Sequence, residues 1–130
     1  MIIKGLNIKQ CYVVNEDIHF GFITIFKDSN PLHTNENFAI EKGFRSKVMH
    51  GNILNGFLSH FIGECLPTKN VIIHSQQINF NKPVYLNDIL TLFATVEEIF
   101  ESVNTAEIKF YFENQNNIKV AKGRITIGLI

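Results

Sequence analysis

The spacing of apolar and polar residues divides the chain into a helical first half and a strand-like second half. A short strand is expected over residues 9–14, and Asn15 then acts as the N-cap of a helix that ends near Lys27. Three apolar residues support this helix at helical spacing: Ile18, Phe22 and Ile25. A second, shorter helix is expected over residues 36–42, because Gly43 follows it in the position that favours glycine.

A third helix, over residues 51–65, has the clearest amphipathic pattern in the chain. Its apolar face is wider than a surface helix requires and contains Ile53, Leu54, Phe57, Leu58, Phe61, Ile62 and Cys65. The opposite stripe holds small or polar residues: Asn52, Gly56, Ser59 and Gly63. The pattern predicts a central helix that is largely enclosed by the rest of the protein and ends before Pro67.

Beyond residue 70 the apolar period changes from helical spacing to two, which is typical of strands. Four strands are predicted, over residues 71–80, 89–100, 103–112 and 118–130. Short polar connections make neighbouring strands antiparallel. The economical arrangement is one α+β domain over residues 1–130, with about five curved strands wrapped around the central helix. The open edge of such a sheet could be covered by a second copy of the chain, so we expect a homodimer.

Composition and charge exclude several classes of function. The chain has 130 residues, which fits one domain, and its 12 basic and 12 acidic residues balance to zero formal charge. This balance argues against a nucleic-acid or membrane surface built on net charge. No apolar run approaches the ~18 residues of a membrane span, and the N-terminus does not resemble a signal peptide, so a soluble cytoplasmic protein is expected. Cys11 and Cys65 form no redox or zinc motif and are expected to be reduced and mostly buried.

Asp28 and His33 are the first candidates for chemistry. They stand five residues apart, and Pro31 between them makes a turn that can fold the two side chains toward each other. A carboxylate and an imidazole placed in this way can hold a water molecule, one accepting a proton and the other donating one. The alternative is an ordinary turn, in which Asp28 caps a backbone amide and His33 is a solvated or satisfied neighbour.

Gly51, at the start of the long helix, is the second candidate. The first N–H groups of a helix lack intrahelical partners and lie at the positive end of its dipole. A glycine lets a carbonyl group approach the backbone closely, so the Gly51 N–H could form an oxyanion hole. The alternative is a helix start at which glycine serves only close packing.

Three stretches of the chain stand in an order and spacing typical of one family. They are residues 28–33 (Asp-Ser-Asn-Pro-Leu-His) followed by Ala39, residues 48–51 (Val-Met-His-Gly) before the apolar helix, and residues 80–88, with Pro-Val and a turn that ends in Asp. Together they resemble the motifs of the MaoC-like dehydratases, which include the (R)-specific enoyl-CoA hydratases. The resemblance runs from about residue 15 to residue 88, and the later strands match only in length and pattern.

This resemblance implies a hotdog fold, in which an antiparallel sheet wraps around a long helix. It also implies a homodimer with its pocket near the subunit interface, and acyl thioesters of coenzyme A or acyl carrier protein as substrates. The implied reaction is reversible addition of water across a trans-2-enoyl thioester to give the (R)-3-hydroxyacyl thioester. Neither a metal nor another cofactor is required.

Several residues match the family's functional positions. Asp28 and His33 match the catalytic pair that activates the water and shuttles the proton, and Gly51 matches the glycine whose N–H meets the thioester oxygen. Ser59 matches a serine that lines the family's site. Asn30 matches the motif asparagine, which we interpret as orienting the turn rather than reacting.

The sequence departs from the family motif just before Asp28. Lys27 stands where the motif commonly has glycine, and Phe26 is also unlike the usual small residue. If the backbone needs a positive φ at this point, lysine costs about 1–2 kcal/mol there. The departure concerns the local geometry of Asp28 and not the chemistry itself.

The remaining candidates have weaker signals. His50 is assigned to the substrate site with a mainly structural role, Ile62 is a candidate limit of the acyl tunnel, and Lys82 could meet a phosphate or be a solvated rim residue. The other histidines are expected on the surface or satisfied, and with Glu64 they form no convincing metal triad: His19, His60 and His74. Four phenylalanines are assigned to the core: Phe57, Phe61, Phe80 and Phe110.

Two other functions remain open at this point. A hotdog thioesterase would hydrolyse the thioester with a carboxylate, although the motif at residues 28–33 argues against it. A non-catalytic module that binds acyl thioesters is the other alternative, because a fold alone does not determine function. The sequence does not distinguish coenzyme A from acyl carrier protein as the carrier, nor does it give the length of the acyl chain.

Overall fold

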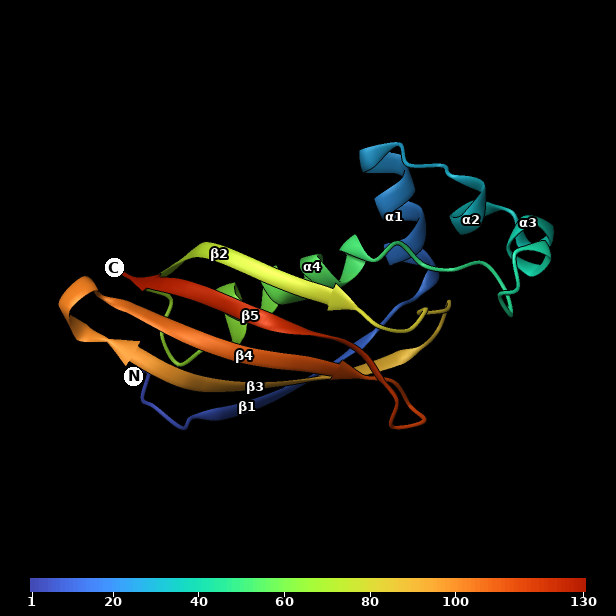
Figure 1. Ribbon diagram of the computed structural model, residues 1–130. Coiled ribbons are helices and arrows are strands. Elements are labelled where there is room, and N and C mark those ends of the chain that lie inside the picture. Colours follow the sequence, from blue (N-terminus) through green and yellow to red (C-terminus); the bar gives the residue numbers. More distant parts are fainter.

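A five-stranded antiparallel sheet curls around one helix in the computed structural model, which describes all 130 residues (Figure 1). The strand order in the sheet is β1-β3-β4-β5-β2, and every neighbouring pair is antiparallel. The strands are β1 (Asn7–Val13), β2 (Val71–Phe80), β3 (Ile89–Phe100), β4 (Thr105–Glu113) and β5 (Lys119–Leu129). This arrangement confirms the predicted α+β class and the wrapped sheet.

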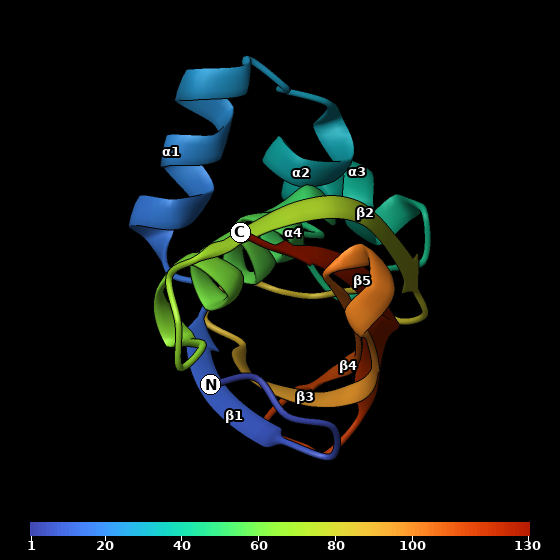
Figure 2. The same cartoon turned by 90° about the vertical axis from the view of Figure 1, so that its left-hand side faces the viewer.

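The period-two pattern of the strands explains why the sheet has one buried face. In β4, four alternate residues are buried against the helix: Ala106, Ile108, Phe110 and Phe112. The same alternation in β3 buries Leu90, Leu92, Ala94 and Val96. These residues belong to a core of 23 buried side chains between the sheet and the helix, which removes their apolar surface from water. Figure 2 shows the sheet curling around that core in an end-on view.

The enclosed helix, α4 (Asn52–His60), continues as a π-helical turn, η1 (Phe61–Cys65). Its apolar face is buried as predicted, at Ile53, Leu54, Phe57, Leu58, Phe61 and Ile62. The expectation that the helix is largely enclosed is wrong within one chain, because its outer stripe is exposed at Asn52, Gly56, Ser59 and Gly63. The sheet covers only the side of the helix that faces it, and the stripe of small residues lies on the other side.

Three helices lie at one end of the sheet (Figures 1 and 2): α1 (Glu16–Phe26), α2 (Pro31–Thr34) and α3 (Glu36–Glu41). The predicted N-cap of α1 is confirmed, since Asn15 Oδ1 accepts from the Ile18 N–H at 3.0 Å. The short helix α2 was not predicted, although its sequence carries the signal. Asn30 caps it by accepting from the Leu32 N–H at 2.9 Å, and Pro31 occupies its first turn.

Several predictions of position or burial are wrong. Phe80 is 51% exposed rather than part of the core, because β2 is the edge strand and the Phe80 ring borders a pocket. Cys11 is exposed on edge strand β1, although both cysteines are free thiols as expected. Val103 lies in the 3-10 turn η2 (Glu101–Val103), so β4 begins later than predicted.

None of the helices combines the length and the apolar character that a bilayer-spanning helix needs.

Lys27 adopts a left-handed backbone conformation, with φ 58° and ψ 27°, at the C-cap of α1. A residue with a Cβ is strained there by about 1–2 kcal/mol, whereas glycine is not, although glycine loses more entropy on folding. We therefore expect Lys27→Gly to raise the free energy of unfolding by about 1 kcal/mol in urea denaturation. Lys42→Gly is the matched control, because Lys42 ends α3 with an ordinary φ of −85°. An equal effect of both substitutions would contradict strain at Lys27.

Candidate active site

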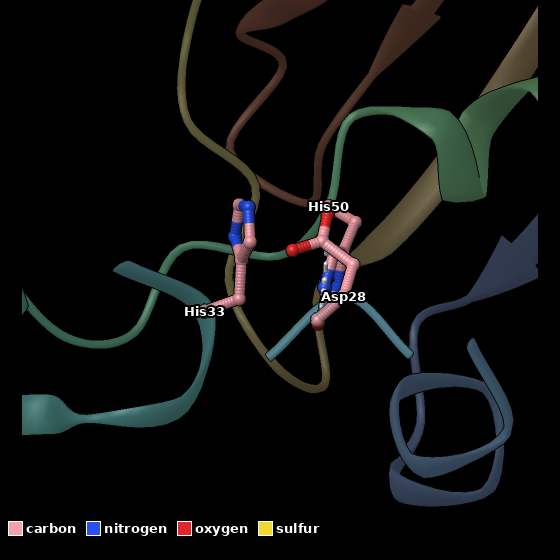
Figure 3. A group of neighbouring side chains, drawn as sticks. All are labelled: Asp28, His33 and His50. Atoms are coloured by element: carbon pink, nitrogen blue, oxygen red, sulfur yellow. Dashed lines mark hydrogen bonds and ion pairs between the residues drawn. The ribbon is translucent and has the colours of Figure 1, made fainter. Parts of the chain in front are cut away.

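Asp28, His33 and His50 come together where α1 and α2 meet the start of α4. One ligand atom from each of the three side chains lies within 4.8 Å of the other two. The rings of His33 and His50 are tilted by 32° with centroids 4.0 Å apart. Figure 3 shows the Asp28 carboxylate directed toward the His33 ring, with His50 beside it. The structure thus brings together two side chains that the sequence assigned to catalysis and one that it assigned to support.

The two histidines make reciprocal hydrogen bonds to each other's chain segments. His33 Nδ1 lies 2.7 Å from the Val48 carbonyl oxygen, and His50 Nε2 lies 2.9 Å from the Asp28 carbonyl oxygen. A carbonyl oxygen only accepts, so each of these nitrogens must carry the proton that it donates. In the neutral rings, His33 Nε2 and His50 Nδ1 are therefore the nitrogens with free lone pairs.

The loop that carries Asp28 is held by a hydrogen bond within its turn and, beyond it, by one from the segment before α4. Asp28 Oδ1 accepts from the Asn30 N–H at 3.2 Å, and the Val48 N–H donates to the Leu32 carbonyl at 3.1 Å. Asp28 Oδ2 lies 3.9 Å from His50 Nε2, and about half of the Asp28 side chain stays exposed. One carboxylate oxygen is thus fixed by the turn, while the other remains open to a reactant. The Asn30 side chain bonds within the turn, where its Oδ1 accepts from the Leu32 N–H at 2.9 Å, and its orienting role stays a prediction.

Gly51 presents an unpaired N–H beside this cluster. It is the N-cap of α4, with no side-chain cap, and its N–H makes no hydrogen bond within the chain. On either side of it, the Met49 N–H donates to the Val84 carbonyl at 2.8 Å and the Leu54 N–H donates to the Gly51 carbonyl at 3.0 Å. The position has little room, because a Cβ on Gly51 would lie 3.0 Å from Phe80 Cε1. Gly51 therefore has an N–H that is free to donate, and the Phe80 ring next to it leaves little space for a larger side chain.

Two pockets border the cluster. The first, of about 440 Å³, is lined by both His33 and Gly51, together with Asn52, Phe80, Lys82 and other residues of the loops after β2 and before α4. The second, of about 920 Å³, is a mainly apolar groove between α1 and α4, with Asp28 at its edge. Asn52 lines both pockets, so the reacting groups lie where they adjoin. A small reactant held at this junction could be reached by Asp28, His33 and the Gly51 N–H.

His19 is a member of the cluster that the sequence analysis missed. It was expected on the surface or hydrogen-bonded, but it is 2% exposed and its Nδ1 has no partner. Its ring centroid lies 5.8 Å from that of His50, which is 3% exposed and also has an unpartnered Nδ1. No local pattern marks His19, because its burial depends on how α1 packs against the segment before α4. The other two histidines lie elsewhere: His60 Nδ1 is hydrogen-bonded to the Tyr12 hydroxyl at 2.9 Å, and His74 is exposed.

Burial sets the electrostatics of the two buried imidazoles. Desolvation lowers the pKa of His19, and nearby Lys47 and the neighbouring histidines lower it further. Desolvation is also the largest cause that lowers the pKa of His50, ahead of the opposing hydrogen bond to the Asp28 carbonyl. Both rings therefore resist protonation near neutral pH, which keeps His50 neutral while it donates to Asp28.

The same three side chains could be considered as metal ligands. His50 Nε2, however, carries the proton that it donates to the Asp28 carbonyl, so this nitrogen has no lone pair for a metal. Asp28 and His33 Nε2 alone would be a weak ligand set for a tightly held ion. The hydrogen bonding therefore favours acid–base chemistry at this cluster.

The remaining predicted site residues lie outside this cluster. Ser59 is exposed on the outer stripe of α4, and Ile62 is buried in the core under the sheet. Neither of them lines the two pockets. Their assignment to the substrate site stays a prediction.

The family model for the MaoC-like domain matches residues 6–118 of the chain. The protein therefore belongs to the MaoC-like domain family, and the wrapped sheet is its hotdog fold. The solved (R)-hydratase of Aeromonas caviae superposes with a TM-score of 0.91 at 24% sequence identity, over 99% of this chain and 98% of that one. This likeness shows the shared fold.

Two curated relatives are similar in sequence. An (R)-specific enoyl-CoA hydratase of Rhodospirillum rubrum is 30% identical over 93 residues, which cover 72% of this chain and 65% of the relative. A 3-hydroxybutyryl-CoA dehydratase of Methylorubrum extorquens is 33% identical over 88 residues, which cover 68% of this chain and 56% of the relative. The matched segment thus spans less than two thirds of each of these relatives.

The buried histidines predict a loss of stability in acid. An unfolded histidine takes up a proton near pH 6.5, whereas folded His19 and His50 resist it, so below that pH the unfolded chain binds more protons. The free energy of unfolding should therefore fall as the pH drops from 7.5 to 5.0, by up to about 1.4 kcal/mol per pH unit for each such group. Urea denaturation across this range measures the slope.

His19→Leu removes one of the two groups, so it should flatten that slope. His74→Leu, at an exposed position on β2, is the matched control and should leave the slope unchanged. The same slope in wild type and His19→Leu would show that His19 is not the source of the pH dependence.

Proposed function

We propose that the protein adds water to trans-2-enoyl thioesters to give (R)-3-hydroxyacyl thioesters, or catalyses the reverse dehydration. One observation carries the proposal: the Asp28 carboxylate and the His33 imidazole face each other beside the unpaired N–H of Gly51. The names of the two relatives in the MaoC-like family support the same reaction class.

The water binds between Asp28 and His33 in this mechanism. A carboxylate oxygen of Asp28 and a ring nitrogen of His33 lie within 4.8 Å of each other, which lets one water sit about 2.8 Å from both. Asp28 Oδ2 and His33 Nε2 both accept, so the water donates one proton to each and its oxygen lone pair points away from them. The lone pair of the water oxygen attacks C3 of the enoyl thioester. At the same time, Asp28 and His33 together take up one proton from the water.

The same proton completes the reaction. Attack at C3 moves an electron pair toward the thioester carbonyl and gives an enolate, whose C2 then takes the proton from the Asp28–His33 pair. The pair ends in the protonation state in which it began, and the net change is addition of one water. The dehydration runs through the same steps in reverse.

The Gly51 N–H stabilises the enolate oxygen. It lies in the pocket that His33 also lines, at the N-terminus of α4, where the helix dipole favours negative charge. Because the donor has no partner in the folded chain, it needs no rearrangement to receive the oxyanion.

Acyl thioesters of coenzyme A or acyl carrier protein are the proposed substrates, and no cofactor takes part. We propose a homodimer, because the exposed stripe on α4 and the open sheet edges at β1 and β2 leave surface for a second copy of the chain. The proposed location is the cytoplasm. Ser59, on that stripe, could then border a pocket completed by the partner.

Asp28→Asn and His33→Ala should each lower kcat/KM for crotonyl-CoA hydration by about 10²–10⁴-fold, because each removes one acid–base group. Loss of the enoyl-thioester absorbance measures the rate. Asp17→Asn and His74→Ala are matched controls at exposed positions and should keep wild-type rates. Circular dichroism would verify that the variants fold.

The same assay separates the alternatives. Near wild-type rates in either variant would contradict the mechanism. Free thiol released from acyl-CoA without hydration would identify a thioesterase, and thioester binding without turnover at any chain length would identify a binding module.

Gly51 allows a direct test of the oxyanion donor. Its φ of −57° suits proline, which removes the N–H, whereas alanine keeps the N–H and adds a similar Cβ next to Phe80. Gly51→Pro should therefore have a kcat about 10²–10³-fold lower than Gly51→Ala, the usual effect of losing one such donor. Equal rates in the two variants would show that this N–H does not stabilise the transition state.

A further inference from the structure

A polar pocket of about 330 Å³ adjoins the candidate active site. It lies where the loop after α3, the loop after β2 and the turn between β4 and β5 meet at one end of the sheet (Figure 1). Lys82 and Pro83 line both this pocket and the one that contains His33 and Gly51. A flexible ligand arm that leaves the reaction site past Lys82 would therefore enter the polar pocket.

Two cations of this pocket have no anionic partner. The ion pairs of the chain involve other basic residues, so neither Arg45 nor Lys82 has a carboxylate within 4.0 Å. Both side chains are exposed toward the pocket they line. Two unpaired cations beside one cavity favour an anionic ligand.

Tyr85 holds Arg45 in place. The Arg45 guanidinium lies 4.2 Å from the centroid of the Tyr85 ring, and the Arg45 N–H donates to the Tyr85 hydroxyl at 3.3 Å. A guanidinium stacked on a ring loses less freedom when it binds an anion, and its planar donors suit phosphate oxygens. Tyr85 is thus a positioning residue for Arg45.

The one carboxylate that lines the pocket, Asp88, repels a bound anion only weakly. Asp88 is buried, and its two oxygens accept from the Tyr85 N–H at 2.9 Å and from Gln115 Nε2 at 3.0 Å. These donors compensate the carboxylate locally, while Arg45 and Lys82 remain free.

We infer that this pocket binds the phosphate of the substrate's phosphopantetheine arm, through Arg45 and Lys82. The inference rests on the proposed function, which places the thioester carbonyl at the Gly51 N–H and so directs the arm toward Lys82. That phosphate is common to coenzyme A and acyl carrier protein, so the pocket would serve either carrier. Lys82 alone was a weak signal in the sequence, and the fold places a second cation, Arg45, at the same pocket although the two are far apart in the chain.

The test compares substrates with and without the phosphate. In Arg45→Gln/Lys82→Gln, KM for crotonyl-CoA should rise at least about tenfold with kcat unchanged, as expected for loss of charge-assisted hydrogen bonds. KM for crotonyl-N-acetylcysteamine, which has no phosphate, should not change. Lys4→Gln/Lys109→Gln is the control of equal charge, at positions that do not line the pocket. Unchanged KM for crotonyl-CoA in the pocket variant would overturn the inference.

The source of the phosphate is distinguished by a third substrate. Of the phosphates of crotonyl-CoA, crotonyl-acyl carrier protein keeps only the one on the phosphopantetheine arm, so its KM should rise as well. A rise for crotonyl-CoA alone would overturn the assignment to the shared phosphate.

Direct binding separates this inference from the proposed function. In calorimetry, wild type should bind 4′-phosphopantetheine about tenfold more tightly than pantetheine, and Arg45→Gln/Lys82→Gln should bind both equally. This result can hold even if no thioester is hydrated, in which case only the proposed reaction fails. Equal affinity of wild type for the two compounds would overturn the phosphate site, whatever the enzyme's activity.

Discussion

The reciprocal hydrogen bonds of His33 and His50 are the interaction on which the rest of the site depends. Each ring donates to a backbone carbonyl of the segment that carries the other ring, at Val48 and at Asp28. The two loops therefore fix each other, and each bond also fixes which ring nitrogen is protonated. The tautomer of His33, with its Nε2 free, is thus set by the Val48 carbonyl and not by a carboxylate. A backbone-defined tautomer is less sensitive to surrounding charge than one set by a carboxylate, because a carbonyl does not titrate.

The wrapped sheet gives these loops a firm base. By burying the inner face of α4, it holds the start of that helix at the end of the sheet where α1, α2 and α3 lie (Figure 1). The backbone bond from Met49 to Val84 then ties that helix start to the loop after β2. Both sides of the pocket that His33 and Gly51 line are thus anchored in the same core, while the loops between them carry the candidate catalytic residues.

Periodicity was sufficient for the sheet, the long helix and the cap of α1, because each depends on local pattern and burial on one face. The spacing of residues 28–33 made Asp28 and His33 candidates but left an ordinary turn open, and the resemblance to the MaoC-like motifs was needed to assign them to catalysis. His19 and Arg45 could not be found in this way, because they reach the site through packing between distant segments. Phe80 was wrongly assigned to the core, because the alternation of apolar residues in β2 predicts a strand but does not tell whether that strand lies at an edge of the sheet, where Phe80 is exposed.

The strand order has a consequence for how the chain assembles during synthesis. Strand β2 pairs only with β5, from Val71 opposite Leu129 to Phe80 opposite Ala121. A nascent chain therefore cannot complete this edge of the sheet until β5 has left the ribosome. Until then, the loop that begins after Phe80 lacks the hydrogen bonds that the Asn81 and Lys82 N–H groups donate to the Val120 carbonyl, although Asp28, His33 and Gly51 have long been made. The border of the pocket beside β2 is accordingly completed late, when β5 pairs with β2, and not when the segment that carries Asp28, His33 and Gly51 is made.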